Sequence, residues 1–197
     1  MSTRSPIATL PSDQRYRLGG LIFLLSLLIF FLSSILLYAL YAYWRRDDPQ
    51  RLSELPASFL VSTCCLLLIS GLVHAATRAI RRERRQMTTI LLGVSALTAI
   101  IFMAIQFVSM IQLLTGPGMV AGTSRGVVGM VVVLAFLHAV HVFGGVIALG
   151  LVATRSLEGR YDHERHWPVD FAAQYWHFLD LIWIAMLTSF WLTTGGF

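Results

Sequence analysis

Five long apolar segments, separated by short polar stretches, determine what this 197-residue chain can fold into. The segments cover residues 18–44, 57–79, 88–114, 126–154 and 171–192. A helix needs about 20 apolar residues to cross the hydrocarbon core of a bilayer, so each segment is long enough. The third segment ends before Gly116-Pro117-Gly118, which breaks helical continuation. The pattern predicts an all-α, polytopic transmembrane bundle with five spans.

The composition agrees with a membrane protein. Charged residues make up 13% of the chain, against roughly 25% in soluble domains, and 56% of the residues are hydrophobic. The mean hydropathy is +0.71. Five spans use most of the length and leave no room for a separate soluble domain. We therefore expect residues 1–17 to form a cytoplasmic amino-terminal segment and residues 18–197 to form one transmembrane domain.

The basic residues predict the orientation in the membrane. All 15 are arginine, and they lie in short stretches between spans rather than in one long stripe, which argues against nucleic-acid binding. With the amino terminus inside, eleven arginines lie on the inner side: Arg4, Arg15, Arg17, Arg78, Arg81, Arg82, Arg84, Arg85, Arg155, Arg160 and Arg165. Four lie outside: Arg45, Arg46, Arg51 and Arg125. The positive-inside rule places the amino terminus in the cytoplasm and the carboxyl terminus outside.

Signals for a catalytic centre or a metal site are weak. The sequence has no glycine-rich phosphate loop, no zinc-protease HExxH pattern and no nucleophile elbow. Cys64 and Cys65 are adjacent within an apolar segment, so on a helix their side chains point in different directions. They predict neither a disulfide framework nor a metal site, and we interpret them as packing residues.

Asp180 is the only acidic residue inside a long apolar segment. A carboxylate in hydrocarbon costs at least about 2.5 kcal/mol on insertion scales, so we expect Asp180 to be protonated or to have a partner inside the bundle. His177 stands three residues earlier and shares its helix face. A second polar face occurs at His138 and His141, one turn before Gly144 and Gly145, where another helix can approach closely.

The two polar faces are expected to meet across the hairpin of the last two spans. From the rise of about 1.5 Å per residue, Asp180 and His141 lie at similar depths, so we expect them to be in contact. His138, His141, His177 and Asp180 are therefore predicted to form one buried polar cluster. Spacing alone favours hydrogen bonds between helices over ligation of a b-type haem by histidines on facing helices. A small transporter that uses Asp180 as its coupling carboxylate is a further alternative.

Two motifs carry a resemblance to a known family. The run His138-Ala-Val-His-Val-Phe-Gly-Gly, and about thirty residues later Tyr175-Trp-His-Phe-Leu-Asp-Leu-Ile-Trp, resemble subunit III of haem-copper terminal oxidases, which include cytochrome c oxidase and quinol oxidases. The resemblance extends from about residue 20 to residue 192. It includes Ser62-Thr63, where the family has Asn-Thr, and Gln106, which stands at the family's glutamine. Five spans match the family's shorter form.

The chain departs from the family pattern at two acidic positions. Leu27 follows Ser26 where the family commonly has glutamate, and Ser109 stands where glutamate follows the family's glutamine. Both buried carboxylates are absent, so the roles that the family assigns to them in proton supply or oxygen access do not transfer. The sequence therefore looks like a divergent member, and an accessory subunit near a nitric oxide reductase is an alternative.

The resemblance implies an accessory role. Subunit III of the family carries no haem, metal or other redox group and has no catalytic residue of its own. It packs on the haem-copper catalytic subunit I, beside subunit II, binds phospholipid and sustains turnover while the complex reduces oxygen to water and translocates protons. By resemblance, the lipid-binding candidates are Arg155, Arg160, His166 and Trp176. The expected location is the cytoplasmic membrane of a bacterium.

Overall fold

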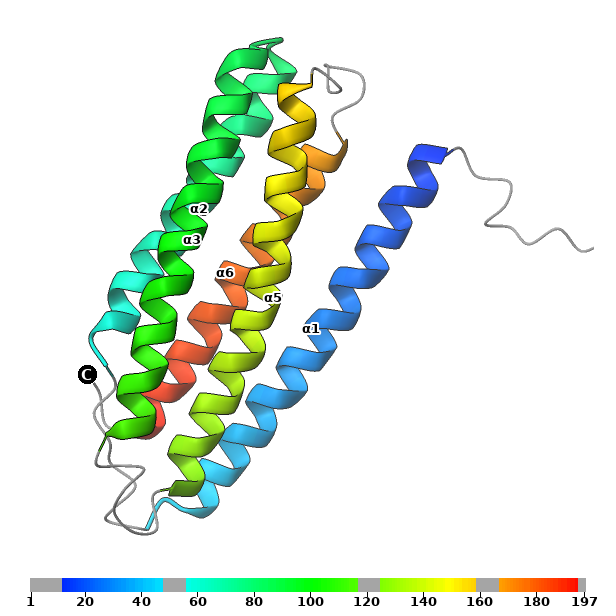
Figure 1. Cartoon of the computed structure of the whole chain (residues 1–197). Helices are drawn as coiled ribbons and strands as arrows, with labels where there is room; N and C mark the ends of the chain where they lie inside the picture. The colour runs from blue at the N-terminus through cyan, green and yellow to red at the C-terminus, as the bar shows by residue number, and fades with distance from the viewer. Residues whose placement is uncertain (1–11, 48–55, 117–124, 159–166, 195–197) are drawn as a thin grey trace, which may run out of the picture.

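The computed structural model describes residues 12–47, 56–116, 125–158 and 167–194 (Figure 1). Within these ranges the chain forms five α-helices and no strand: α1 (Ser12–Trp44), α2 (Ser58–Arg81), α3 (Arg85–Thr115), α5 (Arg125–Leu157) and α6 (Trp167–Thr194). All five helices are long and apolar enough to cross a membrane. The predicted class, an all-α bundle with five spans, is confirmed.

The helices form one elongated bundle (Figure 1). α2 packs along α3, α3 along α5, and α6 against both α2 and α5, whereas α1 packs against α5 and α6. The start of α1, the turn between α2 and α3, the end of α5 and the start of α6 lie at the same end of the bundle (Figure 1). The arginines predicted to be cytoplasmic in these helices and in this turn therefore gather at one end of the molecule.

Most helix ends lie beyond the predicted spans, by as many as six residues, whereas α2 begins one residue later than predicted, at Ser58. α1 begins at Ser12 rather than at residue 18, because the polar residues before the apolar run contain neither glycine nor proline and continue the helix. α6 begins at Trp167, four residues before the predicted start. Pro168 suits the first turn of a helix, and Asp170 places a negative charge near its positive end.

A three-residue turn joins α2 to α3. Glu83 has a positive φ of 60°. The amide of Glu83 donates to the carbonyl of Ile80 at 3.0 Å, and the amide of Arg84 donates to that of Ala79 at 3.0 Å. This is the hydrogen-bond pattern of a Schellman motif, in which the left-handed position is usually glycine. The motif satisfies the last carbonyls of α2 and reverses the chain within three residues.

Glycine and proline follow the end of α3, and an ion pair joins the end of α2 to the start of α6. α3 ends at Thr115, one residue after the end of the predicted span, because Gly116 adopts an extended conformation with ψ 163° before Pro117. At the opposite end of the bundle, the guanidinium of Arg81 donates to Asp170 Oδ2 at 3.0 Å and forms a salt bridge. The pair fixes the end of α2 to the start of α6.

Aromatic side chains fill the core between the helices. The largest fully buried side chains include Trp176, Trp183, Tyr38, Phe31 and Phe59. Tyr38 of α1 hydrogen-bonds Thr193 of α6, and its ring lies 5.2 Å from that of Phe190 in an edge-to-face arrangement. α1 also carries many exposed leucines and isoleucines on its outer side, as expected for a face that contacts lipid or another membrane protein.

Candidate functional site

Three buried polar side chains in the described part of the bundle have a nitrogen or oxygen atom without a hydrogen-bond partner: His138 beside α1, Asp180 between α2 and α6, and Gln106 between α3 and α5. Buried polar groups in a membrane bundle must be paired inside the protein or by something bound to it. These places are therefore the candidate functional sites.

His138 and His141 share one face of α5, as predicted, and this face points to α1. The ring of Phe31 lies 6.1 Å from His138 and 5.0 Å from His141, centre to centre. His138 is fully buried, and neither of its ring nitrogens has a hydrogen-bond partner among the described residues. His141 Nδ1 lies 2.7 Å from the carbonyl oxygen of Leu137 in its own helix. Both imidazoles are enclosed mainly by aromatic rings.

The close approach predicted beside the glycines of α5 is confirmed at Gly145. A Cβ atom at this position would lie 2.9 Å from Tyr175 Cε1 and 3.3 Å from Trp176 Cζ2, so α6 packs directly on the glycine backbone. The hydroxyl of Tyr175 donates to the carbonyl of His141 at 2.8 Å. A Cβ at Gly144 would meet nothing within 4 Å. The motif residues therefore join α5 to α6.

Asp180 and His177 meet α2 through Ser70. The Ser70 hydroxyl hydrogen-bonds both His177 Nδ1 and the carboxyl group of Asp180. A hydroxyl has one proton, so if it donates to Asp180 it accepts from His177. Asp180 and Ser70 are both buried at 7% exposure, while His177 is exposed and lies 5.7 Å from His74, ring to ring. A chain of polar groups thus leads from the surface of α2 and α6 to Asp180.

The predicted contact between Asp180 and His141 is wrong. Asp180 faces α2, whereas His141 faces α1. Trp183, one turn after Asp180, occupies the side of α6 next to α5, where its ring lies 5.1 Å from that of His138. Its indole N–H donates to the hydroxyl of Thr63 on α2 at 2.9 Å. The four predicted residues therefore form two sites instead of one cluster: His138 and His141 beside α1, and His177 and Asp180 beside α2.

Ser70 is the residue that the sequence analysis missed. It stands four residues before His74, and the two side chains therefore share a face of α2. That spacing was the available signal, because His177 and Asp180 are likewise two polar side chains about one turn apart on one face of α6. Small hydroxyl residues are common at contacts between membrane helices, so a serine in an apolar segment attracts little notice alone.

The two positions where the family has glutamate are both inside the bundle. Leu27 of α1 is 9% exposed and belongs to the apolar core. Ser109 of α3 is fully buried and donates to Ser58 of α2 at 2.7 Å. Leucine and serine satisfy these environments without a charge. At position 27 an aliphatic side chain packs in the apolar core, and at position 109 the serine hydroxyl is hydrogen-bonded to the hydroxyl of Ser58.

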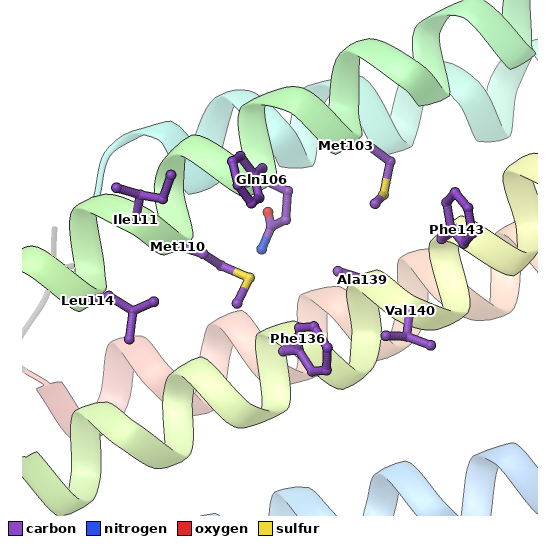
Figure 2. A pocket seen from close by; sticks show the side chains of 10 residues that line it. Met103, Gln106, Met110, Ile111, Leu114, Phe136, Ala139, Val140 and Phe143 are labelled. Atoms are coloured by element: carbon purple, nitrogen blue, oxygen red, sulfur yellow. The ribbon is translucent and has the colours of Figure 1, made fainter.

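The third polar place is a cavity between α3 and α5 (Figure 2). Its volume is about 360 Å³. Gln106 is its only polar lining residue; it is 1% exposed, and neither amide atom has a hydrogen-bond partner among the described residues. Figure 2 shows the amide projecting from α3 toward α5. The apolar lining residues are Met103, Phe107, Met110, Ile111, Leu114, Phe136, Ala139, Val140 and Phe143.

The lipid-binding candidates occupy different environments. Arg155 is exposed in the last turn of α5, where a lipid phosphate can reach it. Trp176 is 1% exposed, and its ring packs beside Gly145 inside the bundle instead of on the lipid-facing surface. Arg160 and His166 lie outside the described residues. Within the described ranges no three histidine, cysteine or acidic side chains are grouped so that they could hold a metal ion.

Comparisons with known proteins agree with the two motifs. A family model described as cytochrome c oxidase subunit III matches residues 7–194. The chain is 31% identical to cytochrome c oxidase subunit 3 of Pylaiella littoralis, over 93% of this chain and 69% of that protein. It is 27% identical to the protein of the same name from Prototheca wickerhamii, over 95% and 73%, and 30% identical to that from Synechocystis sp., over 64% and 52%. The chain thus spans about half to three quarters of the length of these relatives.

Proposed function

Because the chain belongs to the cytochrome c oxidase subunit III family, we propose that it packs on the haem-copper catalytic subunit in the membrane and prolongs that subunit's working life. Family membership makes it an accessory subunit of the oxidase and an integral membrane protein. It does not favour a subunit of a nitric oxide reductase, a di-histidine cytochrome or a transporter. The parent complex would reduce oxygen to water and translocate protons.

One observation supports a packing role more than any other. The side chains of the two family motifs contact neighbouring helices: Tyr175 bonds α5, Trp183 bonds α2, and Asp180 bonds α2 through Ser70. Residues used in this way stabilise a rigid scaffold. Such a scaffold would act on oxygen reduction through the packing and the lipid surroundings of the catalytic subunit.

The proposed orientation keeps the amino terminus in the cytoplasm and the carboxyl terminus outside, with residues 18–197 as one transmembrane domain. The support is the gathering of arginines, including Arg15, Arg81 and Arg155, at one end of the bundle. Fusion of alkaline phosphatase, which folds only outside, tests this directly. Activity is expected for a carboxyl-terminal fusion and not for an amino-terminal one, and the reverse pattern would overturn the orientation.

We place a phospholipid phosphate at the cytoplasmic end of α5, held by Arg155 together with Arg160 and His166. Arginine binds phosphate with two parallel hydrogen bonds, and Arg155 is exposed where a headgroup lies. The burial of Trp176 argues against its direct contact with this lipid. Lipid extracted from the complex should fall by about one molecule per chain in Arg155→Ala. Arg45→Ala, at the opposite end, is the control.

The test of the function compares the oxidase with and without this chain. Initial oxygen consumption should be nearly the same, because no redox group is expected to be lost, but activity should then decay faster during turnover. Adding back the native chain should restore the working life, whereas Gly145→Leu, which blocks the contact of α5 with α6, should not. Immediate and complete loss of oxygen reduction in an intact catalytic core would contradict the proposal.

A further inference from the structure

His74 of α2 and His177 of α6 form a pair of imidazoles on the surface of the bundle. Their ring centres lie 5.7 Å apart, and both side chains are exposed. The salt bridge of Arg81 with Asp170 joins the same two helices. His74 stands seven residues before Arg81, and His177 stands seven residues after Asp170, so the pair lies roughly 10 Å along the helices from the salt bridge. Two antiparallel helices therefore hold the two rings side by side.

Hydrogen bonds behind His177 determine how its ring is turned. Nδ1 is hydrogen-bonded to the hydroxyl of Ser70, which is also hydrogen-bonded to the carboxyl group of Asp180. When Ser70 donates its one proton to Asp180, it accepts from Nδ1–H of a neutral imidazole, and Nε2 carries the lone pair. A histidine that binds a metal almost always donates its other ring N–H to a carboxylate or a similar acceptor, which fixes the tautomer and the ring orientation. Ser70 and Asp180 provide this arrangement.

The distance between the rings suits a shared metal ion. Two imidazoles that bind one tetrahedral zinc, each through a nitrogen about 2.0–2.1 Å from the metal, have ring centres about 5–6 Å apart. Within the described ranges, Nε2 of His177 and both ring nitrogens of His74 form no hydrogen bond, so these atoms are open to a ligand. The nearest charges on the same faces are opposite in sign, because Arg78 follows His74 by one turn and Asp180 lies behind Ser70.

We propose that His74 and His177 bind one zinc ion between α2 and α6, with water in the remaining coordination positions. In the described part of the chain no third histidine, cysteine or acidic side chain joins the pair. Resident zinc sites have three or four protein ligands, so this ion binds reversibly and exchanges with the solution at the end of the bundle where Arg81 and Asp170 lie. Each imidazole donates a lone pair, and nothing is oxidised or reduced. The site does not depend on the accessory role proposed above.

Equilibrium dialysis with radioactive zinc tests the proposal on the complex that contains the full chain. The complex is held in lipid nanodiscs and first freed of metal at its surface with a chelator. The double variant His74→Ala, His177→Ala reports the zinc that binds elsewhere in the complex. At saturation the native complex should bind one more zinc ion per chain than the double variant. Equal binding would overturn the proposal.

Single variants locate the ion. His74→Ala and His177→Ala should each weaken this zinc binding by at least about tenfold, and Ser70→Ala, which leaves both imidazoles in place, should weaken it by about tenfold. His141→Ala is the matched control, because it removes an imidazole that faces α1 and should leave the affinity unchanged. Arg78→Gln removes a positive charge one turn from His74 and should strengthen binding about threefold. Native affinity in either alanine variant of the pair would show that the ion lies elsewhere.

X-ray absorption at the zinc edge identifies the ligands. The difference between the spectra of the native complex and the double variant should show two imidazole nitrogens about 2.0 Å from the metal, with oxygen in the other positions. A shell of oxygen alone would mean that zinc is held by carboxylates or phosphates and would contradict the assignment to His74 and His177.

Discussion

The indole N–H of Trp183 donates to the hydroxyl of Thr63 at 2.9 Å, so the last helix of the chain is hydrogen-bonded to the second. Trp183 is fully buried. Its N–H has no access to water and depends on the threonine.

Thr63→Val should destabilise the protein, because valine has the shape of threonine but cannot accept this bond. The expected loss in the free energy of unfolding is about 1–2 kcal/mol, the cost of an unsatisfied buried donor. Thr63→Ser keeps the hydroxyl and should lose less. Unfolding in mixed detergent with increasing dodecyl sulfate measures both variants. A valine variant as stable as the serine variant would contradict the role of the bond.

Gly145→Ala and Gly144→Ala should differ strongly although the positions are adjacent. The new Cβ at position 145 would lie 2.9 Å from the ring of Tyr175, which is itself held by its bond to His141, so the cost should be about 1–3 kcal/mol. At position 144 the Cβ meets nothing, and the higher helix propensity of alanine should leave stability equal or slightly raised. The same unfolding assay applies. Equal effects would mean that α6 does not pack on Gly145.

Asp180 should be energetically coupled to Ser70 and not to His141. A double-mutant cycle with Asp180→Asn and Ser70→Ala is expected to give a coupling of about 0.5 kcal/mol or more, since the two side chains are hydrogen-bonded. The cycle with His141→Ala should be additive, because this imidazole faces Phe31. Asp180→Asn should also be milder than Asp180→Leu, which leaves the serine without its acceptor. Coupling to His141 alone would restore the pairing predicted from the sequence.

Exchanging the charges of Arg81 and Asp170 should not restore the stability of the native pair. The pair is partly exposed, so each single alanine substitution should cost only about 0–1 kcal/mol, and less at high salt. In the exchanged protein, Arg81→Asp places an acid at the end of α2 and Asp170→Arg a base at the start of α6, which opposes both helix dipoles. Its unfolding midpoint should stay below the native value. A midpoint equal to the native one would show that helix position is irrelevant.

The number and order of the helices could be predicted because apolar length alone determines them. The helix ends could not, since the helices continue into polar residues such as Arg15 and Arg17, where hydropathy no longer reports the structure. At α6 the relevant signals were Pro168 and Asp170, which define the first turn but lie before the apolar run. Helix boundaries in membrane proteins follow local backbone preferences more than hydropathy.

The candidate site was predictable within each helix but not between helices. Spacing of three residues correctly placed His138 with His141 and His177 with Asp180 on common faces. The helix that each face meets depends on how α5 and α6 are rotated. Bulky groups such as Trp183 set that rotation, and their packing is a property of the whole bundle. The cavity beside Gln106 depends in the same way on the separation of α3 and α5.

The three-residue turn at Glu83 also bears on how this protein enters a membrane during synthesis. With its terminal carbonyls satisfied by the turn itself, the α2–α3 hairpin exposes little unpaired backbone at its tip. Two apolar spans joined this tightly cannot occupy separate environments, so one cannot reach the lipid long before the other. We therefore expect the two helices to leave the insertion machinery as a pair and, in the orientation proposed above, the arginines beside the turn to stay on the side of the ribosome.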